Sequence, residues 1–407
     1  MNLQLHKSTI SSNKKIAITG SKSESNRLLL LQALYPSIDI ANLSNSDDSQ
    51  LMQKALKSSD RIIDIHHAGT AMRFLTAFYS TQKNREVELT GSKRMKERPI
   101  AILVDALRQI GADISYKENE GFPPLIIKGK QLTGNKVILK ANVSSQYISA
   151  LLLIAPKLEN GLKLTLEGTI TSIPYIKMTL NLLSQIGVES SFKDNVITVK
   201  PLLNIKENKN LVVESDWSSA SYYFSIIALS DIGTNVTISS YKKESLQGDS
   251  VLAQIYKTFG VSTEFNNNSV TISKTSEAKS IKELNLQEAP DIAQTIAVTA
   301  FGLGLSCYLT GLHTLKIKET DRLVALKTEI EKLGGNVSIT NDSLTLEVSN
   351  SIIKNIEIDT YNDHRMAMAF APLALKTDII IKDYKVVSKS YPTFWKDLKT
   401  LGFNLAL

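Results

Sequence analysis

The sequence predicts an α/β protein that folds as two similar lobes, each built from small repeated α/β units. Three observations support this class. The chain has 407 residues, which is long for a single hydrophobic core. A pattern of helix, Leu-x-x-apolar-Gly, strand, polar turn and second strand recurs at intervals of roughly 70 residues. The last copy of this pattern stops after one strand, so a strand from elsewhere in the chain must complete it.

One glycine marks each copy of the pattern. It ends the predicted helix in left-handed geometry, which glycine adopts without steric strain. Turns such as KDN, NNNS and TNDS between runs of β-branched residues then predict a hairpin. The marker glycines are Gly111, Gly187, Gly260, Gly334 and Gly402.

The truncated copy indicates the domain boundaries. Its single strand, FNLAL, lacks a hairpin partner, and LQLHKSTI near the N-terminus has the length and alternation to pair with it. We therefore expect residues 14–213 to form the first lobe and residues 1–13 and 214–407 the second. The chain would cross twice between lobes, the second time within residues 203–216, around a cleft that opens and closes.

Composition predicts a cytoplasmic globular protein. Hydrophobic residues make up 43% of the chain and charged residues 21%. No apolar run approaches the roughly 20 residues of a membrane span, and the N-terminal stretch has no apolar core typical of an export signal. The single cysteine, Cys307, lies in an apolar run and is expected to be buried. None of the 5 histidines has helical metal-site spacing to another, so we expect no transition metal.

The net charge of +7 indicates an anionic partner. Nucleic acid is one candidate. However, the lysines are scattered, and the aromatic residues, at 6%, do not alternate with a basic stripe. A small, highly charged substrate fits the composition at least as well.

Arginine is concentrated in two unusual strings late in the chain. After Arg108 only Arg322 and Arg365 occur, in KETDR (318–322) and YNDHRMAM (361–368). The planar guanidinium grips a carboxylate or phosphate through two parallel hydrogen bonds, which lysine cannot do. Structural salt bridges are the plainer alternative, but each string packs acid, base and hydrogen-bond donors into a few positions. We therefore predict an anion site at these strings.

Several predicted helices begin with small polar residues. Backbone N–H groups and the positive end of a helix bind anions at such positions, although the same residues are also good helix caps. If the repeats are arranged symmetrically, these helix ends would converge in a rosette. The strings are GSKSESNR (20–27), AGTAMR (68–73), SSQY (144–147), SIPY (172–175) and EAPD (288–291).

These strings, together with RMKERPI (94–100), KETDR, YNDHR and SKSYP (388–392), resemble the EPSP synthase family of 3-phosphoshikimate 1-carboxyvinyltransferases. The resemblance runs from about residue 20 to about residue 395. It implies two lobes of three βαβαββ repeats each, with helices packed inward as an inside-out α/β barrel, joined by two crossings. It also implies transfer of the enolpyruvyl group of phosphoenolpyruvate to the 5-hydroxyl of shikimate 3-phosphate, with release of phosphate, in chorismate and aromatic amino-acid biosynthesis.

The resemblance further implies an enzyme that acts on these two small molecules without a cofactor, nucleic acid or membrane, and that glyphosate inhibits at the phosphoenolpyruvate site. The sequence shows no oligomer interface, so a monomer is the default expectation. Asp291 and Glu319 would be the two acid/base carboxylates, with Lys22 as the cation near the phosphate. The sequence does not assign each carboxylate to one proton, and we favour Asp291 on the side of the 5-hydroxyl. The phosphoenolpyruvate site would comprise Lys22, Gly69, Thr70, Arg98, Gln146, Arg322, Arg365 and Lys389. The shikimate 3-phosphate site would comprise Lys22, Ser23, Arg27, Ser144, Ser145, Gln146, Ser172, Tyr175, Asp291, Thr314 and Lys318.

Three positions depart from the family pattern. Asn is common where His67 and Thr314 stand, and Pro is common where Phe74 stands. Because Pro would start the helix rigidly, we expect Phe74 to loosen that helix and to reduce sensitivity to glyphosate relative to relatives with Pro.

Two alternatives stay open at this point. UDP-N-acetylglucosamine enolpyruvyl transferase shares the fold and the donor, but that family depends on a cysteine in a first-lobe loop, whereas Cys307 lies in the second half. A basic RNA-binding or RNA-end-processing protein could use related repeats. Salt-dependent RNA binding would support it, whereas phosphate release that requires both small substrates would exclude it.

Overall fold

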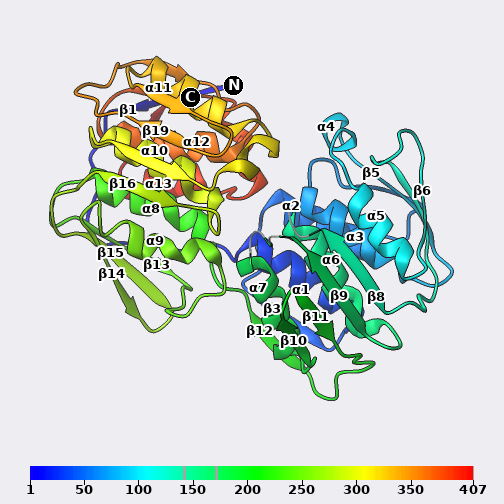
Figure 1. Ribbon diagram of the computed structural model, residues 1–407. Helices are drawn as coiled ribbons and strands as arrows, with labels where there is room; N and C mark the ends of the chain where they lie inside the picture. The colour runs from blue at the N-terminus through cyan, green and yellow to red at the C-terminus, as the bar shows by residue number, and fades with distance from the viewer. Residues whose placement is uncertain (141–143, 169, 171–172, 407) are drawn as a thin grey trace. The chain divides into compact units, whose positions relative to one another are not determined.

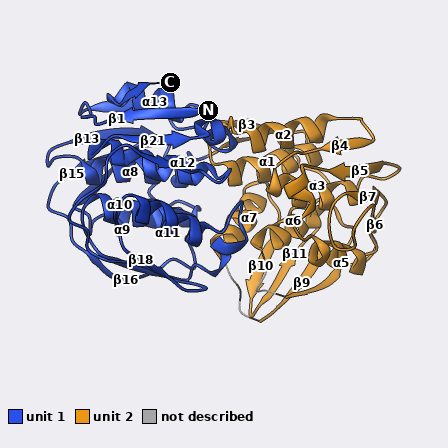
Figure 2. Ribbon diagram, turned by 90° about the horizontal axis from the view of Figure 1, so that it is seen from above, with its two compact units in different colours: residues 1–19, 214–407 blue, residues 20–213 orange. Residues whose placement is uncertain are grey.

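The computed structural model describes residues 1–140, 144–168, 170 and 173–406 (Figure 1). The chain divides into two compact units, coloured separately in Figure 2. Unit 1 comprises residues 1–19 and 214–407, and unit 2 comprises residues 20–213.

The first boundary between units differs from the expected one. We placed it after residue 13, but residues 14–19 belong to unit 1. The reason is that β2 (Lys14–Ile16) pairs in parallel with β13 (Asn235–Ser239) of unit 1. The second boundary lies between Val213 and Glu214. Within the described ranges, no helix is long and apolar enough to cross a membrane.

Unit 2 contains two complete repeats and one reduced repeat in its described residues. The sheets β4-β5-β7-β6 and β10-β11-β9-β8 each combine a parallel pair, joined through a helix, with an antiparallel hairpin. The third sheet is the parallel pair β12-β3. The strands are β3 (Ile38–Ala41), β4 (Ile62–Asp64), β5 (Glu86–Thr90), β6 (Asp113–Tyr116), β7 (Leu125–Lys128), β8 (Lys136–Lys140), β9 (Leu162–Glu167), β10 (Ser190–Lys193), β11 (Val196–Val199) and β12 (Lys209–Val212). The helices are α1 (Lys22–Leu34), α2 (Asp47–Lys57), α3 (Gly69–Ser80), α4 (Lys93–Lys96), α5 (Ala101–Gln109), α6 (Ser145–Ile154), η1 (Ala155–Lys157) and α7 (Ile173–Gln185).

Unit 1 contains three four-stranded sheets in its described residues, β14-β15-β13-β2, β16-β17-β19-β18 and β20-β21-β1-β22. Its remaining strands are β1 (Asn2–His6), β14 (Val261–Asn266), β15 (Ser269–Lys274), β16 (Ile281–Asn285), β17 (Cys307–Thr310), β18 (Val337–Ile339), β19 (Leu344–Leu346), β20 (Ile356–Ile358), β21 (Ile379–Lys382) and β22 (Asn404–Ala406). The helices are α8 (Trp217–Leu229), η2 (Gly248–Val251), α9 (Leu252–Ile255), η3 (Pro290–Ile292), α10 (Ala293–Gly302), η4 (His313–Ile317), α11 (Arg322–Lys332), α12 (His364–Phe370), η5 (Ala371–Leu375), η6 (Tyr384–Lys389) and α13 (Phe394–Leu401).

The N-terminal strand completes the last repeat, as the sequence predicts. β1 pairs antiparallel with β22, with Leu5 opposite Leu405, and it also pairs antiparallel with β21. The predicted helix ends are confirmed at four of the five marker glycines, whereas Gly260 lies five residues after the end of α9, at the end of a run of turns. The marker glycines Gly111, Gly187, Gly260, Gly334 and Gly402 all have positive φ, between 75° and 112°.

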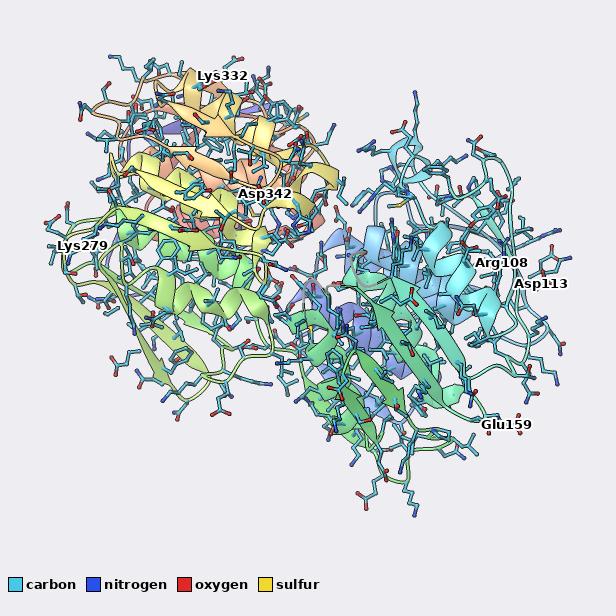
Figure 3. The ribbon with its side chains drawn as sticks, viewed as in Figure 1. Arg108, Asp113, Glu159, Lys279, Lys332 and Asp342 are labelled. Atoms are coloured by element: carbon cyan, nitrogen blue, oxygen red, sulfur yellow. The ribbon has the colours of Figure 1, made fainter. Side chains whose placement is uncertain are left out.

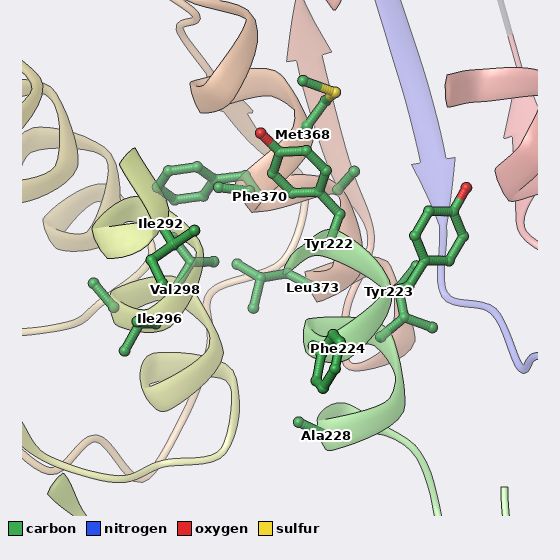
Figure 4. Packing of buried hydrophobic residues seen from close by; sticks show 14 of the residues in the cluster. Tyr222, Tyr223, Phe224, Ala228, Ile292, Ile296, Val298, Met368, Phe370 and Leu373 are labelled. Carbon is green, nitrogen blue, oxygen red and sulfur yellow. The ribbon is translucent and has the colours of Figure 1, made fainter. Parts of the chain in front are cut away.

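The helices of each unit pack inward, and the sheets lie outside them. All 12 residues of α3 and all 13 residues of α8 are buried, and a helix that is buried on every side must lie in the centre of its unit. In unit 1, Figure 4 shows Tyr222 and Phe224 of α8 in one cluster with Ile296 of α10 and Phe370 of α12. Each fully buried large apolar side chain contributes about 1.5–3 kcal/mol relative to exposure.

Serine and threonine hydroxyls satisfy one another inside this core. The Ser221 hydroxyl of α8 lies 3.0 Å from that of Thr295 on α10, and the Thr299 hydroxyl donates to Ser225 over 2.7 Å. Buried polar groups that are paired in this way carry little desolvation cost, so α8 can be buried despite its serines.

Charged side chains lie mainly on the periphery. Asp113 of unit 2 and Lys279 of unit 1 lie at the edges of the view in Figure 3, and both of them, like Arg108 and Asp342, are exposed. Cys307 is buried in β17, as the sequence predicts, and burial raises the pKa of its thiol to about 12.

Candidate active site

In each unit, side chains at the N-terminal ends of several helices contact one another. In unit 1 these ends belong to α8, α10 with its leading turn η3, α11 and α12, and they are linked through Ser218, Asp291, Arg322 and Arg365. In unit 2, Gln146 at the start of α6 donates to the Thr70 hydroxyl at the start of α3 over 3.2 Å. The predicted convergence of helix ends is therefore present within each unit, and such ends favour anions.

Arg322 is the centre of the cluster in unit 1. Its side chain is 2% exposed, and its guanidinium donates to three carboxylates. The bond from Nε to Asp363 Oδ2 is 2.6 Å, that from Nη1 to Asp291 Oδ1 is 2.8 Å, and that from Nη2 to Glu319 Oε2 is 3.0 Å. Burial opposes the charge on this arginine, but Asp363, Glu319 and Asp291 outweigh it and raise its pKa. One buried cation thus joins the two carboxylates that the sequence proposes as acid and base.

Asp291 receives two further cations. Arg365 Nη2 lies 3.2 Å from Asp291 Oδ2, and Lys318 Nζ lies 3.3 Å from Oδ1. Burial would raise the pKa of Asp291, but Arg365, Lys318 and Arg322 together hold that pKa well below its ordinary value. The carboxylate is therefore ionised at neutral pH, and its basicity depends on how strongly these cations hold it.

A second buried carboxylate lies close to this cluster. Asp249 accepts a hydrogen bond from Ser218, whose hydroxyl in turn accepts from Arg365 Nη2 over 3.3 Å. Burial and the charge of Asp291 raise the pKa of Asp249 to about 6. The pKa of Asp291 is lowered and that of Asp249 is raised, and the charge of Arg365 acts on both carboxylates. Their protonation is therefore coupled.

Two further predicted residues of unit 1 lie on neighbouring segments. Lys389, at the end of η6, donates over 2.6 Å to the carbonyl of Asn362, which belongs to the same string as Arg365. Thr314 lies in η4, four residues before Lys318. Its hydroxyl is buried and has no hydrogen-bond partner among the described residues.

In unit 2, Lys22 opens α1 and pairs with α2. Its ammonium Nζ lies 3.3 Å from Asp48 Oδ2 in the first turn of α2. Asp48 also lies 3.6 Å from the His67 Nε2 atom, so this carboxylate connects the loop before α3 to Lys22.

The start of α3 holds two arginines in close proximity. A Cβ atom on Gly69 would lie 2.5 Å from Nη1 of Arg98, so the absence of a side chain at this position makes room for that guanidinium. Arg73 is buried and donates to the uncharged acceptors Gly69 O, Pro99 O and Met95 Sδ. Burial and the nearby charge of Arg98 lower the pKa of Arg73 to about 10. A bound anion would relieve this repulsion.

Arg27 is held by hydroxyls in the core of unit 2. Its Nε donates to Thr179 over 2.8 Å, Nη2 donates to Ser149 over 2.9 Å, and Nη1 donates to the Ser23 carbonyl over 2.7 Å. Burial lowers its pKa to about 10, although Tyr175 and Glu24 partly offset that effect. Two of its five N–H groups are not used by these bonds.

The serine-rich helix starts are only partly described. Ser144 caps α6 by accepting from the Gln146 N–H over 3.4 Å, and Ser145 begins that helix. Ser172 lies outside the described residues. Tyr175 lies on the first turn of α7, with its ring 5.8 Å from the Arg27 guanidinium carbon.

The expectation that Phe74 stands at the start of its helix is wrong. α3 begins at Gly69, so Phe74 lies in the second turn, where it is fully buried and its ring lies 5.4 Å from the Arg27 guanidinium carbon. A side chain packed in this way fixes the helix rather than loosening it.

Sequence reasoning assigned no site role to several members of these clusters. Asp363 and Arg73 stand inside strings that had been singled out, so their positions were available as a signal. Asp48, Ser218 and Asp249 come from segments without a distinguishing pattern. None of the described residues forms a group of three or more His, Cys, Asp or Glu side chains that could hold a metal ion.

The fold and these clusters define a two-unit, inside-out α/β protein with buried arginines and carboxylates at converging helix ends. Residues 53–398 match the sequence model of EPSP synthase (3-phosphoshikimate 1-carboxyvinyltransferase). The chain therefore belongs to the EPSP synthase family, and this membership favours the family's reaction over both alternatives raised by the sequence.

Relatives of similar length support this assignment. A 3-phosphoshikimate 1-carboxyvinyltransferase of Bacteroides fragilis (strain YCH46) is 46% identical over 395 residues, which cover 96% of this chain and 95% of the relative. The enzyme of the same name from Colwellia psychrerythraea is 36% identical over 417 residues, covering 95% and 96% of the two chains. The solved structure of EPSP synthase from Acinetobacter baumannii superposes with a TM-score of 0.81 at 21% identity over 100% of both chains, which supports the fold.

Proposed function

We propose that this chain transfers the enolpyruvyl group of phosphoenolpyruvate to the 5-hydroxyl of shikimate 3-phosphate and releases phosphate. The observation that carries the proposal is the link between Asp291 and Glu319 through Arg322. The reaction needs a base for the hydroxyl proton, an acid for the methylene carbon and cations for the leaving phosphate. All three kinds of group lie in this cluster.

The assigned binding residues divide between the two substrates. Phosphoenolpyruvate would be bound by Lys22, Gly69, Thr70, Arg98, Gln146, Arg322, Arg365 and Lys389. Shikimate 3-phosphate would be bound by Lys22, Ser23, Arg27, Ser144, Ser145, Gln146, Ser172, Tyr175, Asp291, Thr314 and Lys318.

The chemistry proceeds by addition followed by elimination. Asp291 accepts the proton of the 5-hydroxyl as that oxygen bonds to C2 of phosphoenolpyruvate, while Glu319 supplies a proton to the methylene carbon C3. In the second step the C2–O bond to phosphate breaks and Glu319 takes a proton back from C3, which restores the double bond as phosphate leaves. Lys22 stabilises the charge that develops on the departing phosphate.

Substrate binding would also activate Asp291. Arg365 and Arg322 both hold this carboxylate and keep its pKa low. An anionic substrate that binds the two guanidinium groups competes for them, so the pKa of Asp291 rises and the carboxylate becomes a stronger base. The base is therefore weak until the donor substrate is bound.

The test is phosphate release measured with both substrates present and with each omitted. Asp291→Ala and Glu319→Ala should each lower kcat by at least roughly 10²-fold, and the double variant should lose less than the product of the two single losses. Glu283→Ala, at an exposed position of β16 in the same unit, is the control and should keep native turnover. Phosphate release that needs only one substrate, or native turnover in either active-site variant, would contradict the proposal.

A further inference from the structure

His66 and His67 form a hydrogen-bonded pair in the loop between β4 and α3. Their Nδ1 atoms are 2.8 Å apart, and their rings are perpendicular, with 87° between planes and centroids 5.0 Å apart. His66 has a φ of 48°, a left-handed conformation that is uncommon for a residue with a side chain. Its N–H donates to Asp64 Oδ1 over 2.7 Å, and its carbonyl accepts from the Ser92 N–H over 2.8 Å. The backbone around the loop therefore holds the two rings together.

The pair is connected to Lys22 through Asp48. His67 Nε2 lies 3.6 Å from Asp48 Oδ1, and Lys22 Nζ lies 3.3 Å from Asp48 Oδ2. The Asp48 side chain is 9% exposed, while those of His67 and Lys22 are each 22% exposed. Because one carboxylate contacts both groups through different oxygens, a change of charge on His67 alters how strongly Asp48 holds Lys22.

The contact between the rings limits how many protons the pair can carry. In the neutral pair, one Nδ1 donates and the other accepts, and Asp48 favours the arrangement in which His67 places an N–H at Nε2. One additional proton can be accepted while the bond between the rings is kept. A second would place two N–H groups against each other at 2.8 Å. We therefore expect the two histidines to take up one proton as a unit.

We propose that His67 is a positioning residue for Lys22, and that the His66–His67 pair strengthens phosphoenolpyruvate binding when it gains a proton. This inference rests on the proposed function of Lys22. Protonated His67 forms an ion pair with Asp48 across 3.6 Å, which weakens the hold of Asp48 on Lys22 and adds one positive charge to the site. When the histidine pair is neutral, the Asp48 carboxylate forms its ion pair with Lys22 alone, and the site carries one positive charge less.

Other charged groups lie on the elements that surround the histidine pair. They are Lys22 and Glu24 on α1, Asp47 and Asp48 on α2, Asp64 at the end of β4, Arg73 on α3, and Arg98 after α4. Imidazole is the type of side chain whose ordinary change of charge falls between about pH 5 and 8, so the histidine pair is the group to follow in this range.

The first test follows the Michaelis constant for phosphoenolpyruvate in native protein and His67→Asn from pH 5.5 to 8.5. The ratio of the variant's constant to the native one should rise as pH falls, by roughly 3- to 10-fold across the histidine range. Protonation of phosphoenolpyruvate itself affects both proteins equally and cancels in this ratio. The matched control is His6→Asn in unit 1, because His6 also lies close to a carboxylate, 3.5 Å from Asp378, and its ratio should stay flat. A flat ratio for His67→Asn would overturn the proposal.

The second test observes the imidazole groups directly by NMR during a pH titration. We expect His66 and His67 to take up one proton jointly. The midpoint of this titration should shift to lower pH in Asp48→Asn, because the stabilising carboxylate is lost. Two independent titrations, or a midpoint that Asp48→Asn does not move, would refute the link. If the native protein showed no turnover with the two substrates, the proposed function would fail, while this titration would still decide whether the linked pair exists.

Discussion

Asp363→Ala should destabilise unit 1 more than any exposed ion-pair substitution in the same unit. Asp363 is fully buried, and it bonds Arg322 Nε over 2.6 Å and caps α12 by accepting from the Arg365 N–H over 2.9 Å. Loss of a helix cap costs about 1 kcal/mol. Removal of one member of a buried charge pair costs about 3–5 kcal/mol. Because Asp291 and Glu319 still neutralise part of the Arg322 charge, we expect a total of about 3–5 kcal/mol.

Tryptophan fluorescence during urea unfolding measures this effect. Both tryptophans of the chain, Trp217 and Trp395, lie in unit 1, so their signal reports on that unit. Asp359→Ala is the matched control. That carboxylate is 37% exposed and lies 2.7 Å from both Lys332 and Lys382, and exposed pairs of this kind contribute about 0–1 kcal/mol.

Asp363→Asn separates the contribution of the helix cap from that of the charge pair with Arg322. The amide oxygen can still cap α12, but the negative charge beside Arg322 is lost, so this variant should retain the cap contribution of about 1 kcal/mol. The reasoning would be refuted if Asp363→Ala reduced the free energy of unfolding no more than Asp359→Ala, or if the Asn and Ala variants were equally stable.

Three further outcomes follow from the geometry. Gly69→Ala should raise the Michaelis constant for phosphoenolpyruvate at least about 10-fold, because the new methyl group displaces the Arg98 guanidinium, which lies 2.5 Å from its position; an unchanged constant would contradict this. Asp249→Asn should flatten the pH dependence of stability between about pH 4 and 6. The native carboxyl has its pKa raised to about 6, so the folded state binds more protons there and native stability falls as pH rises; urea unfolding at several pH values checks the slope. Phe74→Pro should cost about 3 kcal/mol or more, since Pro in the second turn of α3 removes a backbone donor and clashes with the preceding turn. If the folded variant nevertheless bound glyphosate more tightly than the native protein, position 74 would be shown to limit that inhibitor.

The repeat pattern predicted the fold because its signals are local. A glycine four residues after a buried apolar residue, followed by β-branched runs, indicates a helix end and a hairpin without reference to the rest of the chain. The pairing of β1 with β22 was predictable for a related reason, since an incomplete hairpin requires a strand. The predicted unit boundary after residue 13 was wrong because β2 has only three residues, too few to show the alternation that would identify it as a strand.

The site was predictable where one string holds several functional residues, and unpredictable where a contact joins distant segments. Arg322 and Glu319 are three positions apart and bond each other, as a helix start allows. Arg27 instead donates to Thr179, a residue 152 positions away, and no local pattern indicates that partner. Phe74 illustrates the same limit, because only the observed start of α3 shows that position 74 lies in the second turn.

The buried arginines of the two units differ in the groups that surround them. This difference bears on the role of each unit in the proposed reaction. In unit 1, carboxylates neutralise Arg322 and raise its pKa. In unit 2, the hydrogen bonds described above for Arg27 and Arg73 go to hydroxyls, carbonyls and a thioether, and burial lowers the pKa of each arginine to about 10. A cation surrounded by neutral acceptors gains more from a bound anion than one already paired with a carboxylate. Under the proposed function, the arginines of unit 2 would attract the phosphate and carboxylate groups of the substrates, and the substrates would change the proton affinity of the carboxylates in unit 1.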